Sequence, residues 1–550
     1  MHLFIICHAL LWQWFFTVKV TGVATEKPTS TNTDQSVLHI EFVTTGFFGF
    51  NSHEPVSLGY NATAITTGLP RLRALYHQVI SLTYNAPAII TGVQRLRDLY
   101  PQHWWTSTFL TDPHSRTCPL MLANVYFMLS QWYYSRENTG RLSIIVTPGS
   151  KKGAFHSSAS EPAIRNRQLS PTWLSTTPFA SPNVVFCSLL NNLNWRTVVA
   201  SLDTDSDAHI AYYTYAFNRV VGKLTECSVK FSASSLAYSD GLLVSKLLGE
   251  FHQKTRVFLY FGLPSGLRIL LIAAVARNMT NGDYVYLAVV PWSSSSFGYF
   301  TWQSYQDDDE KVKEAYRSVL LLSLVDETQY GSPSIRNLAQ KWANISQCEY
   351  NNTEPPNYLP IPLMTATQTA VEMAGIAAME ALARSTGLSN GDNGQMLADS
   401  IRNRTYPNLQ TGLWRMSGGG EMLHIVQLAS FDWQEGQLKV FMKGTEIDCT
   451  DIYIWERTST TSESIWHGGS ALPPALPLCG LDGDACSSGR PWVVLATGSS
   501  SAVLVTLAGT ISLFVQMTII RQRRRLWWIL ELQSFIPGTA KEISIYGFQY

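Results

Sequence analysis

The chain reads VFLYF at residues 257–261, GLRILLIAAVAR at residues 266–277 and YVYLAVV at residues 284–290. The first and third segments are rich in β-branched and aromatic residues, which favours buried strands. The middle segment carries apolar residues at helical spacing. A strand, a helix and a strand in this order predict a parallel pair joined by a crossover helix.

The same alternation extends on both sides of this unit. Further strands are predicted at 142–146 and 196–200, and further helices at 208–221 and 241–251. Strands that alternate with helices imply a parallel sheet covered on both faces. Since 550 residues exceed one core, we expect an α/β fold of two lobes facing across a ligand-binding cleft.

Composition excludes several classes of protein. The apolar fraction is 45%, enough to bury a large core, so the chain is not disordered. The 40 Lys and Arg residues balance 40 Asp and Glu residues, whereas a nucleic-acid-binding surface needs a basic excess. We therefore expect no nucleic-acid partner.

Both ends of the chain indicate export and membrane anchoring. Residues 1–24 combine an apolar run with a Gly-Val-Ala end and read as a signal peptide, although no Lys or Arg precedes the run. The apolar stretch 502–520 would form about 28 Å of helix, close to the thickness of a bilayer core. The basic cluster 521–525 that follows it predicts the cytoplasmic side.

The sequence therefore predicts a single-pass type I plasma membrane protein with an extracellular N-terminus. Its expected parts are a signal peptide (1–24), a Ser/Thr-rich segment (25–37), a bilobal ligand-binding domain (38–478), a juxtamembrane cysteine loop (479–492), a transmembrane helix (493–520) and a short tail (521–550).

The glycosylation sites and the cysteines are consistent with an exported chain. Five Asn-x-Ser/Thr sites precede the predicted span and are candidates for glycosylation: Asn61, Asn278, Asn344, Asn351 and Asn403. Seven cysteines follow the signal peptide, an odd number, which leaves one for a free thiol or an intermolecular bridge. They are Cys118, Cys187, Cys227, Cys348, Cys449, Cys479 and Cys486.

No pattern of residues predicts catalysis, a metal or a cofactor. The chain has no Cys-x-x-Cys pair, no His-x-x-x-His spacing and no Gly-x-Ser-x-Gly elbow. The acidic run 307–310 is interpreted as a solvated helix start before a helix at 311–319 rather than a calcium site. Gly418–Gly420 is interpreted as a hairpin turn rather than a phosphate cradle, and 482–484 as a turn. The aromatic stretch 292–305 is either a ligand or dimer surface or part of a lobe core.

One internal repeat is present. Residues 60–76 recur at 84–100 with 12 of 17 positions identical. Two copies do not make a solenoid, so the repeat indicates a local duplication or an error in the gene model.

Six segments give the region from about residue 194 to residue 525 a resemblance to the receptor guanylate cyclases, the group that includes the natriuretic peptide receptors. They are 194–203, 255–262, 268–273, 278–285, 401–406 with 410–413, and 465–469 with 476–486. The resemblance implies a type I periplasmic-binding-protein-like ectodomain that binds an extracellular ligand and works as a homodimer.

The resemblance also implies disulfides. Cys187 would pair with Cys227 and Cys479 with Cys486, whereas Cys118, Cys348 and Cys449 have no obvious partners. In relatives, a Gly-Pro turn precedes the second cysteine of a first-lobe disulfide, and the turn can form an anion site. Here the turn reads Thr147-Pro-Gly-Ser150, with serine instead of cysteine, which puts both the disulfide and the anion site in doubt.

The resemblance ends after the span. Catalytic relatives carry a kinase-like and a cyclase domain there, but this tail has 30 residues, too few for a domain, so no catalytic domain is expected in the chain. We expect a receptor that binds a peptide. One interpretation is the ligand-binding and membrane portion of a receptor guanylate cyclase whose sequence is truncated before those two domains. The alternatives are a short-tailed clearance or decoy receptor, or an ectodomain that senses an amino acid or another solute.

Overall fold

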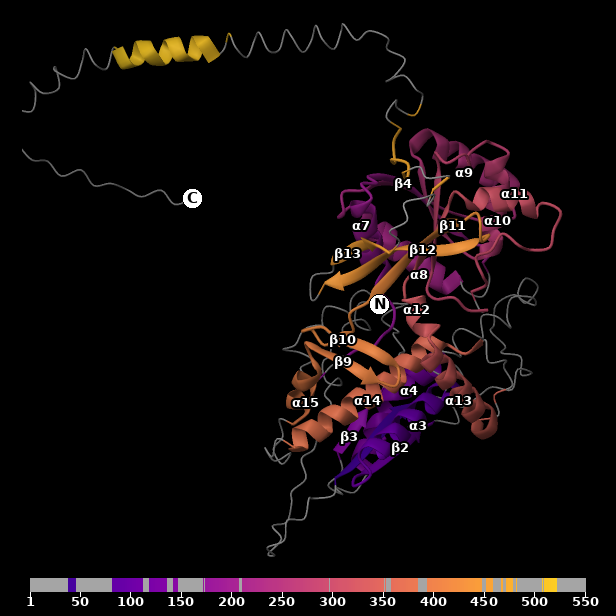
Figure 1. The fold of residues 1–550 in the computed structure, drawn as a ribbon, viewed down its shortest axis with the longest axis vertical. Helices are drawn as coiled ribbons and strands as arrows, with labels where there is room; N and C mark the ends of the chain where they lie inside the picture. Colours follow the sequence, from indigo (N-terminus) through magenta and orange to yellow (C-terminus); the bar gives the residue numbers. More distant parts are fainter. Residues whose placement is uncertain are drawn as a thin grey trace, which may run out of the picture. The chain divides into compact units, whose positions relative to one another are not determined.

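The computed structural model describes residues 38–45, 82–111, 118–135, 142–146, 172, 174–206, 210–295, 297–350, 352, 358–383, 393–447, 452–458, 466–467, 471–477, 481, 507 and 509–521. The chain divides into two compact units, Met1–Pro477 and Leu478–Tyr550. Within the first unit the described strands form two sheets of three and eight strands and one two-stranded ladder (Figure 1).

The three-stranded sheet organises the first lobe. Strand β1 (His39–Thr45) lies between β2 (Trp104–Leu110) and β3 (Leu142–Ile145), and both pairings are parallel. Helix α3 (Leu82–Leu99) contacts β2, α13 (Pro333–Tyr350) and α14 (Ile361–Ala383). The remaining described elements of this lobe are α4 (Cys118–Ser135), α15 (Asn393–Ile401) and the antiparallel ladder of β9 (Arg404–Leu409) with β10 (Gly412–Met416).

The eight-stranded sheet organises the second lobe, in the order β13-β12-β11-β8-β7-β6-β4-β5. Its parallel part comprises β4 (Thr197–Asp203), β5 (Lys230–Leu236), β6 (Val257–Phe261), β7 (Val285–Val290) and β8 (Val319–Ser323). Three antiparallel strands extend it beyond β8, namely β11 (Ile425–Asp432), β12 (Gln437–Ile447) and β13 (Ile452–Arg457).

The predicted parallel sheet covered on both faces is confirmed in this lobe. Val257, Leu259 and Phe261 of β6 point into one core, with α7 (Pro182–Asn192) and α8 (Ile210–Leu224). The alternate residues Phe258 and Tyr260 point into the opposite core. That core includes α9 (Gly241–Lys254), α10 (Pro264–Val275) and α11 (Asp309–Tyr316). An all-apolar strand suits both faces, since successive side chains alternate.

The acidic run forms the start of α11, as interpreted, and Asp307 and Glu310 are exposed, whereas Asp308 and Asp309 are partly buried and ion-paired. Arg268 of α10 forms ion pairs with Asp308 and with Asp309, the latter at 2.7 Å, and donates to Trp302 O at 2.7 Å. Desolvation opposes ionisation of Asp309, but hydrogen bonds from Ser304, Arg268 and the Tyr305 N–H together lower the pKa of its carboxyl to about 2. The helix also ends at Tyr316 rather than Val319, where β8 begins. The run anchors the preceding loop to α10.

The predictions for the glycine turn, the internal repeat and the membrane span compare with the structure as follows. Ser417 N–H donates to Glu421 O at 2.7 Å and Gly420 N–H to Ser417 O at 3.0 Å, so 418–420 form the predicted turn. The second copy of the repeat begins within α3. The first copy, the signal peptide 1–24, the Ser/Thr-rich segment 25–37 and most of 479–550 lie outside the described residues. Residues 509–521 are helical; among the residues described, no helix has the length and apolar character of a membrane span.

Candidate functional site

The chain passes three times between the two lobes, through crossing segments 175–181, 324–333 and 422–425. Met422 N–H donates to Ser175 O at 2.9 Å, and Ala180 N–H donates to Leu324 O at 3.3 Å. Thr176 Oγ1 donates to Ala366 O of α14 at 2.9 Å. The crossings are therefore bonded to one another and to the first lobe.

The carboxyl ends of β7 and β8 meet these crossings, since Trp292 after β7 stacks on Phe179 of the first crossing and β8 runs directly into the middle crossing. The chain leaves β4 toward β5 on one side and reaches β6 on the other side of β4. In open α/β sheets, ligands bind outside the carboxyl ends of the strands where the order reverses in this way. We call this edge of the second-lobe sheet the carboxyl edge, comprising residues 203–206, 261–263, 290–295 and 323–328.

Asp203 at the end of β4 is the buried carboxylate of the reversal point. It accepts from Ser206 Oγ at 2.7 Å and from Asp205 N–H at 2.9 Å, and the Tyr260 hydroxyl lies 3.3 Å away. Burial raises the pKa of Asp203, and the hydrogen bond from Ser206 opposes that rise. A Cβ on Gly266 would overlap the Asp203 carboxylate and the Tyr260 hydroxyl, so α10 can approach only because this residue is glycine.

Glu327 is the second carboxylate of this edge and lies on the middle crossing, in the short helix α12 (Glu327–Tyr330). Its Oε1 accepts from Ser293 N–H at 2.7 Å and from Ser323 Oγ at 3.0 Å. Burial raises the pKa of Glu327 although these hydrogen bonds oppose the rise. The carboxylate thereby joins the ends of β7 and β8.

The third crossing carries a second set of polar contacts. Gln427 of β11 donates through Nε2 to Asp326 and, at 2.9 Å, to Thr328 Oγ1. Lys443 of β12 lies 3.4 Å from the Asp326 carboxylate. His424 Nδ1 lies 2.6 Å from Glu446 Oε2 and its Nε2 lies 2.9 Å from Thr177 O.

Four buried polar atoms along or beside this edge have no hydrogen-bond partner in the described part of the chain. They are the Tyr213 hydroxyl, Trp292 Nε1, Ser294 Oγ and Gln427 Oε1. Buried polar atoms are nearly always hydrogen-bonded, and an unmet one costs about 1–3 kcal/mol. The set contains a donor, an acceptor and two hydroxyls. These atoms are able to hydrogen-bond to a polar ligand.

The aromatic stretch 292–305 contributes to this edge mainly as core. Trp292 stacks on Phe179 of the first crossing with ring centroids 5.0 Å apart, and it meets Phe297 edge-on at 4.7 Å. Phe297 also meets Tyr213 at 6.3 Å. Tyr299 and Tyr305 are exposed. The core interpretation therefore holds for Trp292 and Phe297.

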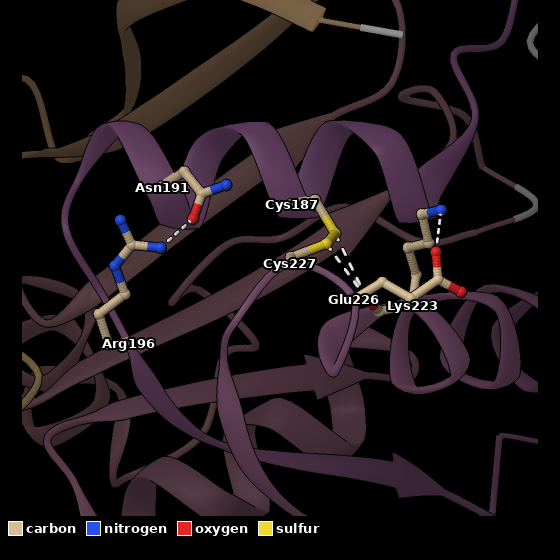
Figure 2. The surroundings of a disulfide bond; sticks show 6 residues. All are labelled: Cys187, Asn191, Arg196, Lys223, Glu226 and Cys227. Carbon is tan, nitrogen blue, oxygen red and sulfur yellow. Dashed lines mark hydrogen bonds and ion pairs between the residues drawn. A yellow bond between two sulfur atoms is a disulfide. The ribbon is translucent and has the colours of Figure 1, made fainter. Parts of the chain in front are cut away.

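The disulfide implied for the second lobe is present: Cys187 of α7 is bonded to Cys227, which follows α8, with Cα atoms 5.7 Å apart (Figure 2). Beside it Arg196 donates to Asn191 Oδ1 at 2.5 Å, and Lys223 pairs with Glu226. Cys348 is an exposed free thiol on α13. Cys449, Cys479 and Cys486 and the side chain of Cys118 lie outside the described residues.

The candidate glycosylation residues are not part of the carboxyl edge. Asn278, Asn344 and Asn403 are exposed, as attachment of a sugar requires, and Asn61 and Asn351 lie outside the described residues. Glycosylation at all five stays a prediction. In the described part of the chain, no group of three His, Cys, Asp or Glu residues is placed to hold a metal ion.

Sequence reasoning missed Asp203, Glu327, His424 and Gln427 as site residues. Asp203 ends a predicted strand, which was an available signal. The other three become neighbours only through the crossings, which no local pattern reveals.

Comparison with known proteins assigns the family. A profile described as the receptor family ligand binding region matches residues 146–429, just over half of the chain. The chain belongs to this family. The match runs from the end of the first-lobe sheet into β11, so the receptor family ligand binding region includes the carboxyl edge and all three crossings. No curated protein matches the chain.

Proposed function

We propose that this chain is the extracellular part and anchor of a single-pass type I plasma membrane receptor, and that its ligand is a peptide. Membership of the receptor family ligand binding region supports ligand binding. The resemblance of six segments to receptor guanylate cyclases supports a peptide ligand, a homodimer and an anchor at 493–520.

The ligand contacts the carboxyl edge of the second lobe. The observation that carries this assignment is the unmet hydrogen-bonding capacity of Tyr213, Trp292, Ser294 and Gln427 next to the crossings. A ligand group that hydrogen-bonds to these atoms removes the free-energy cost of leaving them buried and unpaired. Because the crossings carry the neighbouring contacts, such a ligand also favours one arrangement of the crossings over others.

The same observation favours a second candidate, an amino acid or a similar small solute. A few convergent polar groups among apolar side chains are typical of small-molecule sites. A peptide would satisfy them through one side chain or terminus, whereas a solute would satisfy them alone. The two candidates differ in what else the ligand touches.

A thermal-shift screen of the full chain in detergent separates these candidates. The probes are the twenty free amino acids on one side and fractionated extracellular peptides on the other. A probe that binds the native state at 100 times its Kd adds about 2.7 kcal/mol of stability. Stabilisation by peptides alone supports the peptide receptor, and stabilisation by one amino acid supports the solute sensor.

Trp292→Phe tests the site. This change keeps an aromatic ring on Phe179 and removes the unpartnered N–H, so we expect binding of the active probe to weaken about tenfold, as loss of about 1.4 kcal/mol implies. Trp433→Phe is the matched control, since Trp433 is half exposed and stacks near cationic side chains away from this edge. Equal affinity in both variants would contradict the assignment.

A further inference from the structure

The segment that leaves the second lobe is bonded along the opposite edge of the sheet, at the amino ends of the parallel strands. We call Trp466, His467 and residues 471–477 the exit strap. Trp195 Nε1, ahead of β4, donates to Pro473 O at 2.9 Å. Ahead of β6, Arg256 N–H donates to Ala475 O at 2.9 Å and Thr255 Oγ1 to the same oxygen at 3.0 Å.

The first residues of the exit strap are bonded at β7 and β8. Trp466 is fully buried, and its Nε1 donates to Gly282 O at 2.8 Å. His467 Nε2 lies 2.9 Å from Ser318 Oγ, immediately before β8. The exit strap thus contacts the amino ends of four neighbouring strands, β4, β6, β7 and β8, and it precedes the second compact unit, Leu478–Tyr550.

The His467 ring occupies a site shaped by a glycine. Gly282 has a φ of +98°, and a Cβ there would lie 3.0 Å from His467 Cγ. Both the backbone conformation and the space therefore require glycine. The ring is held closely on this side and has little freedom to move while the exit strap stays docked.

Three charged side chains act on His467. Arg317 lies just before Ser318, Glu314 lies on α11, and Asp283 lies just before β7. Burial, followed by the charge of Arg317, lowers the pKa of His467, while Glu314 and Asp283 oppose that effect. Glu314 is itself paired with Arg317 at 2.8 Å. The net environment favours a neutral ring.

We propose that the exit strap is an acid-released tether between the second lobe and the C-terminal unit. Acidification charges the His467 ring beside Arg317 in a half-buried site, and the exit strap leaves the amino edge of the sheet. At neutral pH the docked exit strap transmits the position of the sheet to the segment that follows it; in an acidic compartment that link is lost. The proposal does not depend on which ligand binds at the carboxyl edge.

The direction of the pH effect follows from linkage. A docked ring with a lowered pKa stays neutral where a released ring, with a pKa of about 6.5, already takes a proton. The released state therefore binds more protons, and docking weakens as pH falls below about 6.5. Above that pH docking is independent of pH.

Hydrogen–deuterium exchange of the full chain measures docking directly. The Arg256 amide donates to Ala475 O of the exit strap, so its protection reports on docking. The Tyr286 amide donates to Ser318 O inside the sheet and serves as an internal reference. Exchange is compared at pH 7.5 and pH 5.0 after correction for the intrinsic rate at each pH. We expect protection of Arg256 to fall at pH 5.0 while that of Tyr286 holds.

Two variants separate proton binding at His467 from general acid destabilisation. His467→Gln keeps a polar group near Ser318 and cannot become charged, so protection at Arg256 should no longer depend on pH. Arg317→Gln keeps the histidine and removes its cationic neighbour, so charging the docked ring costs less and the loss of protection at Arg256 between pH 7.5 and pH 5.0 should become smaller. Unchanged protection of the wild-type exit strap at pH 5.0 would overturn the proposal. A loss as large as that of wild type in His467→Gln or in Arg317→Gln would overturn it as well.

Discussion

Gly266 shows how one missing side chain sets the local geometry of the carboxyl edge. Its Cα faces the Asp203 carboxylate and the Tyr260 hydroxyl so closely that a Cβ would overlap both. Both neighbours are buried and hydrogen-bonded, so neither can move freely. The start of α10, the buried carboxylate and β6 therefore form one tightly packed unit.

Gly266→Ala should destabilise the chain by about 1–3 kcal/mol, because overpacking displaces Asp203 or α10. Gly249→Ala is the control. Gly249 is also helical, but nothing lies within 4 Å of its would-be Cβ. The control should stabilise α9 by about 0.5–1 kcal/mol through helix propensity. Thermal unfolding of the two variants should shift in opposite directions, and a parallel shift would contradict the packing argument.

Glu327 gives a pH-dependent prediction at the same scale. Its pKa is raised in the folded chain by burial, so the folded state binds a proton more readily than the unfolded state. Its contribution to stability is therefore present below the unfolded pKa of about 4.5 and is lost as pH rises.

Glu327→Gln keeps an oxygen for Ser293 and Ser323 but cannot ionise, so it should melt at a higher temperature than wild type at pH 7. The advantage should shrink as the pH approaches 4.5. Glu456→Gln, at an exposed position of β13, is the matched comparison. A stability difference for Glu327→Gln that stays constant between pH 4.5 and pH 7 would show that desolvation is not the cause.

Among elements, α7 and α8 pack on one face of the second-lobe sheet and are also covalently linked. The Cys187–Cys227 bond closes a loop with a sequence separation of 40 residues. Closing such a loop in the unfolded chain accounts for about 4 kcal/mol of stability on the chain-entropy estimate.

Replacing both cysteines with serine should therefore lower the free energy of unfolding by about 2–5 kcal/mol. Glu226→Gln is the control, since it breaks only the exposed pair with Lys223, worth about 0.2–1 kcal/mol. Chemical denaturation of the oxidised chain and the two variants measures the difference. A loss no larger than that of the control would mean that packing alone holds α7 to α8.

The loop between β7 and α11 depends on a second cross-link, made by Arg268. Arg268→Met removes the partner of Asp308 and Asp309 and the donor to Trp302 O. We expect a loss of about 2 kcal/mol and faster amide exchange in residues 299–308, since these charge-assisted bonds are only partly exposed to water. Arg277→Met, which removes an exposed contact with Ser245, should change stability by less than about 0.5 kcal/mol.

Local sequence pattern predicted these elements well where a strand or helix is continuous. VFLYF and YVYLAVV form β6 and β7 because a short run of consecutive apolar residues is best buried as a strand covered on both faces. The pairing of Arg268 with Asp308 and Asp309 was missed because it joins residues 40 and 41 positions apart through an irregular loop. Charge runs carry no information on which partner the fold will bring to them.

At the scale of the whole first unit, His424 connects two crossings and β12. Its ring lies between the Glu446 carboxylate, 2.6 Å from Nδ1, and Thr177 O, 2.9 Å from Nε2. Glu446 also receives the His424 backbone N–H at 3.1 Å. Through these contacts His424 joins the first and third crossings to β12.

His424→Phe should loosen this joint while leaving the sheet intact. We expect faster exchange of the Met422 amide, which donates to Ser175 O between the same crossings, and little change at Tyr286 in β7. His252→Phe, which removes a contact with Tyr284 at the far side of the sheet, should leave Met422 protected. Equal protection of Met422 in wild type and His424→Phe would show that backbone bonds alone hold the crossings.

The crossings mark the limit of sequence-based prediction for this protein. Two α/β lobes followed from chain length and alternation, but the return of residues 425–457 to the sheet of the second lobe depends on the pairing of β11 with β8. That pairing joins segments about a hundred residues apart, and an antiparallel partner leaves no local mark on either strand. Gln427, Asp326 and His424 could not be predicted as neighbours without it.

The discontinuous sheet has a consequence for synthesis. The 101 residues from 324 to 424 separate β8 from β11, and they build much of the first lobe before the second sheet can be finished. A ribosome working at about 5–20 residues per second needs roughly 5–20 s to make them. During that interval β8 is the open edge of an incomplete sheet, which other chains can join. A chaperone bound at the edge of β8 until β11 emerges would prevent such pairing. Premature termination between the two strands would release a fragment that keeps this open edge and is therefore prone to aggregate.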